Sequence, residues 1–280
     1  MISGHTHQAY VCTIDGRLVT SADKFGTLVT AIDLTLDPAS RDVISAKADN
    51  VIVRSKALAS DPEQTALLSA YDRLAAPIAN RPAGSITETL SRTPNAAGES
   101  VLGDIIADAQ LEATHAATDG GAAIALTNPG GIRTDMTRLD QGQVRYADLF
   151  ASQPFRNQLV TLTLTGQQIK DLLEQQWLDP NRPRILQVSR GFSYAWDALR
   201  PDGDHVIAER LQLNGQHLDP TKSYRVTVNN YLAAGGDGFS ILKAGTAPRF
   251  GVYDADALLG YFQAHSPIAP GSPDRILRLN

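Results

Sequence analysis

Apolar and polar positions alternate from Tyr10 to about Val53 in the way that half-buried β-strands do. Tyr10–Ile14 and Arg17–Ser21 flank Asp15-Gly16, a dipeptide typical of two-residue hairpin turns. Leu28–Leu36 alternates for several residues and predicts another strand. We therefore expect a β-meander in this part of the chain.

The spacing of apolar residues changes to a helical period between Pro62 and Asn80, at Leu67, Leu68, Tyr71, Leu74, Ala75 and Ile78. Asp61 stands directly before Pro62, where it can cap the helix. The sequence Arg-Pro-Ala-Gly at 81–84 then breaks the pattern. We interpret this helix and break as a connector between a β-rich segment and a second domain.

Helical and strand patterns alternate in the rest of the chain, which predicts a mixed α+β (α/β) domain. We expect a helix from Glu99 to about Ala116, a strand over Ala122–Thr127, and a strand over Leu159–Thr165 that leads into a helix with a Thr165/Gln168 capping box. A hairpin follows, formed by Val206–Leu213 and a return strand around the turn Asn214-Gly215. The last expected elements are a strand over Tyr224–Val228, a helix that Asp254 caps and that runs through Phe262, and a strand over Ile276–Leu279. Three acidic residues are interpreted as helix-start and solvent-facing positions: Glu99, Asp104 and Asp108.

The composition is that of a globular protein, and its charge narrows the possible partners. Twenty-five Lys and Arg face 30 Asp and Glu, a net charge of −5 over 280 residues. We find no clustered basic face of the kind that a nucleic-acid polymer or an anionic membrane requires. No apolar run reaches about 18 residues, so we expect no membrane span, and no signal peptide is visible. The single cysteine, Cys12, excludes an internal disulfide and a cysteine-rich zinc site.

Two histidines close to the first residue, His5 and His7, are candidate metal ligands. In an extended segment, imidazoles two residues apart point the same way and can ligate one metal or two adjacent metals. Zinc takes about three or four protein ligands, so this pair needs partners outside the chain. The alternative is a disordered pair of histidines at a terminus.

Two glycine-rich loops are candidates for ligand binding. Asn128-Pro-Gly-Gly-Ile-Arg133 follows a strand, and its glycines permit a close backbone approach beside the fixed cation of Arg133, which suits an anion or a polar ring. In Gly235-Gly-Asp-Gly-Phe239, a tight turn can present Asp237 to the two hydroxyls of a sugar diol. Either loop could also be a plain glycine turn.

Aromatic residues accompany these loops. Phe155 lies in the turn Gln153-Pro-Phe-Arg-Asn157 and could belong to the core, or it could sandwich a flat heterocycle together with Tyr231. No phosphate-binding P-loop, serine-hydrolase elbow or dinucleotide fingerprint is present. Serine-nucleophile and dinucleotide-dependent enzymes are therefore disfavoured.

Five segments, taken in order, resemble the 5′-nucleotidase family: Ser3-Gly-His-Thr-His7, Gly98-Glu-Ser-Val-Leu-Gly-Asp-Ile-Ile-Ala-Asp-Ala109, Asn128-Pro-Gly-Gly-Ile-Arg133, Pro154-Phe-Arg-Asn157 and Tyr231-Leu-Ala-Ala-Gly-Gly-Asp-Gly-Phe239. The resemblance covers nearly the whole chain. It implies that residues 1–55 are the last part of an N-terminal calcineurin-like metallophosphoesterase sandwich, that 56–82 form a linker helix, and that 83–280 form the C-terminal substrate-binding domain.

The resemblance also implies roles for single residues. His5 and His7 match the last two ligand positions of a two-metal centre, usually zinc or manganese. The positions that match the family's substrate-binding residues are Asn128, Gly131 and Arg133 for the nucleotide and its phosphate, Arg92 as a further phosphate-side arginine, Phe155 and Tyr231 for stacking the base, Asn157 in the base-contacting turn, and Gly236 and Asp237 for the ribose hydroxyls.

The family's other metal-ligand segments, D-x-H, a bridging Asp and G-N-H-[DE], are absent from this sequence. Two-metal hydrolysis needs both ions about 3.5–4 Å apart. We therefore expect no catalytic residue within the chain, which would be inactive alone and would lack the N-terminal catalytic domain. Met1 then indicates an internal start, a truncated reading frame or an artificial boundary.

The resemblance implies the substrate-binding part of a phosphoesterase that hydrolyses nucleotides to nucleosides and phosphate, in nucleotide catabolism. Full-length relatives are often periplasmic or on the cell surface. One alternative is a non-catalytic module that binds a nucleotide or nucleoside. Another is a hydrolase of 2′,3′-cyclic nucleotides, nucleotide sugars or a non-nucleotide phosphoester. A third expectation is that the first 55 residues leave an exposed sheet edge that aggregates or dimerises.

Overall fold

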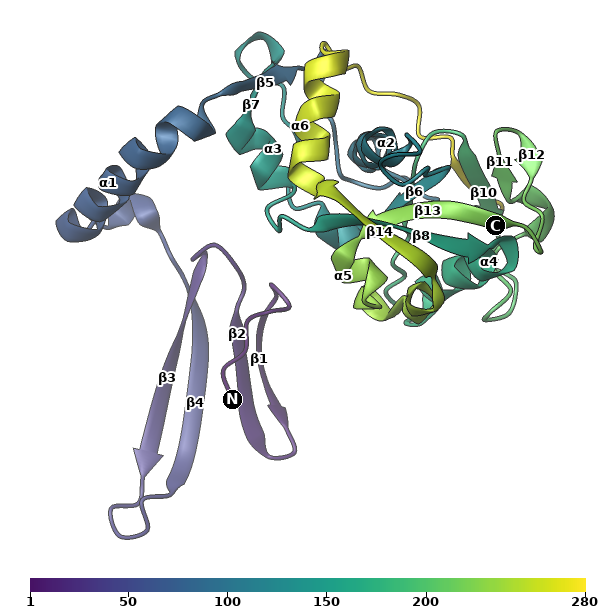
Figure 1. Cartoon of the computed structure of the whole chain (residues 1–280). Helices are drawn as coiled ribbons and strands as arrows, with labels where there is room; N and C mark the ends of the chain where they lie inside the picture. Colours follow the sequence, from purple (N-terminus) through teal and green to yellow (C-terminus); the bar gives the residue numbers. More distant parts are fainter. The chain divides into compact units, whose positions relative to one another are not determined.

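The computed structural model describes residues 1–280, apart from the side chain of Asp140. The chain divides into two compact units, Met1–Asp72 and Arg73–Asn280 (Figure 1). The boundary falls within helix α1 (Pro62–Ala79). The backbone N–H of Gln64 donates to Asp61 Oδ1 at 2.9 Å, so the predicted cap of this helix is confirmed.

The first unit consists of two antiparallel ribbons, β1 (Ala9–Ile14) with β2 (Arg17–Ala22), and β3 (Leu28–Leu36) with β4 (Val43–Ile52). Asp15 and Gly16 have φ values of +48° and +73°, which a hairpin of this kind requires, so the predicted turn is confirmed. Each ribbon forms its own two-stranded sheet, so the expectation of a single meander is wrong. A hydrogen bond of 2.9 Å from Asn50 Nδ2 to Ser21 O joins the two ribbons.

The first unit buries little apolar surface. Among its described residues, Val19 is the only buried apolar side chain. The large exposed apolar side chains on its four strands are Val11, Ile14, Val29, Leu34, Leu36, Val43, Ile44, Val51 and Ile52. Burial of apolar surface contributes about 25 cal/mol per Å², so this unit gains little stability from its own packing.

The second unit is built on a five-stranded sheet with the order β14-β8-β13-β6-β9. Its strands are β6 (Ile124–Thr127), β8 (Gln158–Thr165), β9 (Gln187–Val188), β13 (Ser223–Asn229) and β14 (Thr246–Tyr253). Only the β13–β6 pair is parallel. The smaller sheets contain β5 (Pro82–Ser85) with β7 (Gln143–Arg145), and β10 (Phe192–Trp196), β11 (Gln212–Leu213), β12 (Gln216–His217) and β15 (Ile276–Arg278).

The helices of the second unit are α2 (Val101–Thr114), α3 (Tyr146–Ser152), α4 (Gly166–Glu174), α5 (Asn230–Ala233) and α6 (Asp254–His265). Short 3₁₀ turns occur at Ser55–Ala57, Pro129–Gly131, Asp140–Gly142, Gln175–Trp177, Ala208–Arg210, Gly236–Gly238 and Ser240–Ala244. Helix α2 packs against α6, which directly follows β14 (Figure 1). The mixed α and β architecture confirms the predicted fold class.

Several local predictions are confirmed and others are wrong. Thr165 and Gln168 form the predicted capping box at the start of α4. Residues 82–85 form β5 rather than a break, because their backbone pairs with β7. The strand expected from Val206 is interrupted by the turn Ala208–Arg210, so the hairpin around Asn214-Gly215 is short. At the start of α6 the N-cap position belongs to Tyr253, and Asp254 is the first helical residue.

The acidic residues assigned to a solvent face are buried, and this expectation is wrong. The exposed fractions of Glu99, Asp104 and Asp108 are 0%, 6% and 6%. Asp108 accepts two hydrogen bonds from the Arg275 guanidinium, at 2.7 and 2.9 Å. Glu99 accepts the backbone N–H groups of Arg275 and Ile276, at 2.9 and 3.0 Å. These carboxylates therefore anchor the strand β15 to α2.

Asp104 is the least satisfied member of this cluster, since its Oδ1 has no hydrogen-bond partner among the described residues. Burial raises the pKa of Asp104 to about 8, the Arg275 charge lowers it, and the nearby Glu99 and Asp108 raise it further. A carboxyl group whose pKa is raised by folding stabilises the fold below its unfolded pKa. That contribution is lost as the pH rises through the folded pKa.

We expect the free energy of unfolding to fall between about pH 4 and about pH 8 through Asp104, and Asp104→Asn to flatten that slope. The amide stays neutral at every pH, so the variant should match the wild type at the acidic end and exceed it at the alkaline end. Urea unfolding across this range measures the slope. Asp108→Asn is the control, because loss of the bidentate pair with Arg275 should destabilise the protein at both ends. An unchanged slope in Asp104→Asn would contradict the assignment.

Candidate functional site

The ends of two neighbouring parallel strands bring two asparagines together. β6 ends at Thr127 and is followed by Asn128, and β13 ends at Asn229. Because parallel strands finish at the same edge of a sheet, the two side chains meet there, with Asn229 Nδ2 at 3.1 Å from Asn128 Oδ1. Both side chains are buried.

The direction of each hydrogen bond in this pair follows from a backbone donor. The N–H of Leu232, in the first turn of α5, donates to Asn229 Oδ1 at 2.8 Å. A backbone N–H can only donate, so the other end of the Asn229 amide is the donor to Asn128 Oδ1. Asn128 Nδ2 in turn donates to Asp237 Oδ2 at 2.7 Å. We call the chain from Leu232 N–H through Asn229 and Asn128 to Asp237 the asparagine relay.

Asp237 lies in a turn that only glycine-rich sequence permits. The φ values of Gly235, Asp237 and Gly238 are +83°, +55° and +89°. The backbone N–H of Asp237 donates to the Tyr231 hydroxyl at 3.0 Å, and this hydroxyl donates to Asp237 Oδ1 at 2.9 Å. A Cβ on Gly236 would lie 2.5 Å from Tyr231 Cε1, so the close contact between ring and turn requires glycine at this position.

Two aromatic rings are exposed at this edge of the sheet. Phe155 is 54% exposed and Tyr231 is 46% exposed, so neither belongs to the core. The guanidinium carbon of Arg133 lies 5.6 Å from the centroid of the Phe155 ring. Exposed aromatic faces beside a carboxylate and a cation are the features that a flat, polar, anionic ligand requires.

Arg133 and Arg92 are held through the same loop. Arg92 Nη1 donates to the carbonyls of Ile132 and Arg133, at 3.0 and 2.7 Å. Arg133 Nη1 donates to Gly130 O at 3.2 Å. A Cβ on Gly130 would lie 3.8 Å from Asp237 Oδ2, so this loop runs from the carboxylate to the two arginines.

The neighbouring residue of the same loop, Gly131, lies close to the relay. A Cβ on Gly131 would be 3.1 Å from Asn128 Oδ1, tighter than an ordinary contact. The backbone carbonyl of Asn128 also accepts a hydrogen bond from the Gly131 N–H at 3.0 Å. Glycine here therefore lets the turn close over the asparagine.

Asn157 reaches the same edge because β8 runs antiparallel to β13, with Leu159 opposite Asn229. The Asn157 carbonyl accepts the backbone N–H of Asp254 at 2.8 Å. Burial raises the pKa of Asp254 to about 6, against hydrogen bonds from the Ala255 N–H and the Asn157 side chain that lower it. Asp254 therefore supports the turn that carries Asn157.

Comparison with known proteins identifies the family. Residues 78–244, more than half of the chain, match the family model "5'-nucleotidase, C-terminal domain". The chain belongs to the 5′-nucleotidase C-terminal domain family. The matched range contains every sequence-predicted substrate-binding residue, and within it Asn128, Tyr231 and Asp237 are joined by hydrogen bonds.

Relatives and solved structures agree with this family. The chain is 28% identical over 279 residues to "Endonuclease YhcR" of Bacillus subtilis, covering 99% of this chain and 22% of that protein. It is 29% identical over 256 residues to "Cell wall protein Lmo0130" of Listeria monocytogenes, covering 87% and 32%. The crystal structure of a 5'-nucleotidase precursor from Thermus thermophilus matches with a TM-score of 0.76 and 29% identity, over 100% of this chain and 59% of that one. The chain thus spans less than two thirds of the length of these relatives.

The 5′-nucleotidase family is of metallophosphoesterase type, which makes the conformation of His5 and His7 relevant. The His7 N–H donates to Gly4 O at 3.0 Å and His7 has a φ of +53°, so residues 4–7 form a turn. The segment is therefore a turn and not the extended segment that was predicted from the sequence. The described residues contain no group of three His, Cys, Asp or Glu that could hold a metal ion. His5 and His7 do not complete a metal centre.

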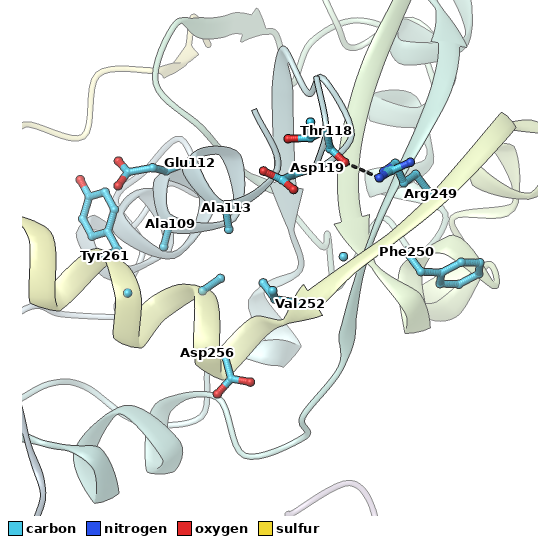
Figure 2. Close-up of a pocket in the computed structure, with 13 residues that line it drawn as sticks. Ala109, Glu112, Ala113, Thr118, Asp119, Arg249, Phe250, Val252, Asp256 and Tyr261 are labelled. Atoms are coloured by element: carbon cyan, nitrogen blue, oxygen red, sulfur yellow. Dashed lines mark hydrogen bonds between the residues drawn. The ribbon is translucent and has the colours of Figure 1, made fainter. Parts of the chain in front are cut away.

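A pocket of this nucleotidase-family unit lies away from the residues around Asp237, between α2, α6 and β14 (Figure 2). It measures about 550 Å³, and its lining includes Ala109, Glu112, Thr118, Arg249, Val252 and Tyr261. Figure 2 shows Arg249 turned toward the Thr118 carbonyl, to which it donates a hydrogen bond. Glu112 is paired with His265 at 2.9 Å and with Arg190 at 3.3 Å. None of the sequence-predicted site residues lines this pocket.

Three residues that contact the candidate site were not assigned to it from the sequence. Asn229 precedes a short helix, and its capping position was the one available signal. Arg184 donates to the Asp237 carbonyl at 2.8 Å from a distant loop, and no local pattern indicates this contact. Asp254 was assigned to helix capping alone.

Among the described residues, no helix is long and apolar enough to span a membrane.

We expect Gly236→Ala to displace the Tyr231 ring and break its hydrogen bonds with Asp237, because the new Cβ would collide with the ring. Unfolding stability should change by less than about 1 kcal/mol, since the half-exposed ring can move into solvent. Aromatic NMR signals of Tyr231 and thermal unfolding measure the two effects. Gly260→Ala is the control, because a Cβ there meets nothing within 4 Å. Unperturbed Tyr231 signals in Gly236→Ala would contradict the described packing.

Proposed function

We propose that this chain is the substrate-binding part of a 5′-nucleotidase-like phosphoesterase and that it binds the nucleoside part of a nucleotide. The observation that carries the proposal is the Asp237 carboxylate, held by Asn128 and Tyr231 beside exposed aromatic rings. A carboxylate suits a sugar diol, and aromatic faces stack on every base. Membership of the 5′-nucleotidase C-terminal domain family supports this assignment.

Each residue of the site has a role in this proposal. Phe155 and Tyr231 stack on the base, Asn157 contacts its edge, and Asp237 accepts the ribose hydroxyls. Arg133 and Arg92 neutralise the phosphate side, and Gly131 and Gly236 allow a close backbone approach. Binding energy from base and ribose would orient the phosphate ester for attack and so lower the entropic part of the barrier.

Hydrolysis to nucleoside and phosphate requires more than these residues. His5 and His7 would be two ligands of the family's two-metal centre, with zinc or manganese, and the remaining ligands would come from an N-terminal catalytic domain. We therefore propose that the isolated chain binds without hydrolysing. By the same argument it contains no catalytic residue.

We further propose that residues 1–55 are the last part of the metallophosphoesterase sandwich, 56–82 a linker helix and 83–280 the substrate-binding domain. The exposed valines, leucines and isoleucines of β3 and β4 support this division, because a sheet face of that kind is normally covered. The relatives include a protein named for the cell wall, which supports a periplasmic or cell-surface location.

Calorimetric titration with adenosine and AMP tests the proposal, with and without Mn²⁺, beside an assay of phosphate release. We expect metal-independent binding, no phosphate release, and at least about a fivefold loss of affinity in both Phe155→Ala and Asp237→Ala. Loss of one stacking face or of a charged acceptor costs about 1–3 kcal/mol, which corresponds to roughly fivefold to 150-fold.

Phe250→Ala and Asp256→Ala are matched controls, because they remove another exposed phenylalanine and another aspartate carboxylate, both at the pocket of Figure 2. These controls should bind as the wild type does. The absence of binding by the wild type, or equal losses in the controls, would contradict a nucleoside site at Asp237. Phosphate release by the chain alone would contradict the proposal that the chain binds without hydrolysing.

A further inference from the structure

We propose that the Tyr231 hydroxyl is a positioning group that locks the Asp237 carboxylate, together with the asparagine relay, into the orientation that accepts a ribose 2′,3′-diol. This inference rests on the proposed function, because it concerns the same site. It assigns the hydroxyl a task separate from that of the aromatic ring. The ring stacks on the base, and the hydroxyl orients the carboxylate that binds the sugar.

The position of the phenolic proton follows from its two partners. The Asp237 N–H can only donate, so it occupies a lone pair of the Tyr231 oxygen at 3.0 Å. The ionised carboxylate can only accept, so the single phenolic proton lies on the 2.9 Å line to Asp237 Oδ1. The two hydrogen bonds close a ring between one side chain and one residue of the turn. The phenol and the carboxylate therefore move as a unit.

We call the hydrogen bonds between Tyr231 and Asp237 the lock. It leaves a defined number of acceptor positions on the Asp237 carboxylate. Each carboxylate oxygen has two lone pairs. Tyr231 uses one on Oδ1, and Asn128 Nδ2 uses one on Oδ2 at 2.7 Å. With these two bonds, and no other to the carboxylate among the described residues, one acceptor position on each oxygen is left for a ligand. Two adjacent hydroxyls, as in a cis-diol, fill this pair, whereas a single hydroxyl fills half of it.

Without the hydroxyl, the bond from Asn128 Nδ2 to Asp237 Oδ2 is the one hydrogen bond to the carboxylate that remains among the described residues. The neighbouring Gly235, Gly236 and Gly238 have no side chains, and glycine allows more backbone freedom than any other residue. Arg184 holds the Asp237 carbonyl but not the carboxylate. Removal of the hydroxyl should therefore loosen the carboxylate while the ring stays in place.

Comparison of two ligands that differ only in the diol tests this proposal. Adenosine and 2′,3′-dideoxyadenosine are titrated into the wild type, Tyr231→Phe and Tyr231→Ala. We expect Tyr231→Phe to weaken adenosine about tenfold and to leave dideoxyadenosine within about twofold, because phenylalanine keeps the stacking face. Tyr231→Ala should weaken both ligands, because it removes ring and hydroxyl together.

Tyr224→Phe is the matched control. The Tyr224 hydroxyl also accepts a backbone N–H, that of Asp219, at 2.9 Å, but Tyr224 lies at the opposite end of β13. Its loss should change neither affinity. A readout without ligand is the phenol titration followed at 295 nm, as the difference between the wild type and Tyr231→Phe. Burial and the hydrogen bond to Asp237 raise the pKa of Tyr231, and Asp237→Asn should lower it toward its ordinary value.

The outcomes separate the lock from the proposed function. Equal weakening of both ligands in Tyr231→Phe, or no weakening of either, would overturn the lock while nucleoside binding stands. Equal affinity of the wild type for both ligands would also overturn it, because the diol would then make no contact. Failure of the wild type to bind either ligand would overturn the proposed function, and the lock with it.

Discussion

One backbone donor, the Leu232 N–H, sets the direction of every hydrogen bond in the asparagine relay. Because this group can only donate, Asn229 must present its oxygen to α5 and its nitrogen to Asn128. Asn128 must then present its nitrogen to Asp237. The carboxylate at the surface is thus oriented by a helix N-terminus two side chains away. A change at either asparagine would reverse or break this order.

The sheet makes this arrangement possible by joining distant parts of the chain. Asn128 and Asp237 are 109 residues apart, yet the parallel pairing of β6 and β13 places their loops at one edge. The antiparallel partner β8 adds Phe155 and Asn157 from the turn that precedes it. Elsewhere in the same unit, Asp108 of α2 and the nearby Glu99 hold Arg275, the residue directly before β15. Strands of one sheet therefore bring the residues of the candidate site together at one exposed edge.

Local patterns predicted much of this fold because they depend on short-range physics. The Asp15-Gly16 turn, the Asp61 cap and the capping box at Thr165 are encoded within a few residues each. Burial of Glu99, Asp104 and Asp108 was mispredicted, because their partner Arg275 lies more than 160 residues away. β14 was not predicted, since its sequence has no clear alternation and its strand conformation comes from pairing with β8.

In the candidate site, too, short-range features were predicted and long-range contacts were not. The residues that form it could be named from motifs, but their hydrogen bonds could not, because these depend on which strands are neighbours. Asn229 and Arg184 are recognised as part of the site only from such contacts. The resemblance supplied roles for Phe155, Tyr231 and Asp237, which stay predictions until a ligand is seen. The geometry adds the direction of each hydrogen bond and the number of free acceptor positions.

The most direct measurement is a crystal structure of the chain grown with adenosine. We predict the base at the exposed rings of Phe155 and Tyr231, with both ribose hydroxyls on Asp237 and the bonds from Asn128 and Tyr231 retained. Adenosine bound elsewhere, for instance in the pocket between α2, α6 and β14, would contradict the account. So would a ribose that displaces the Tyr231 hydroxyl from the carboxylate.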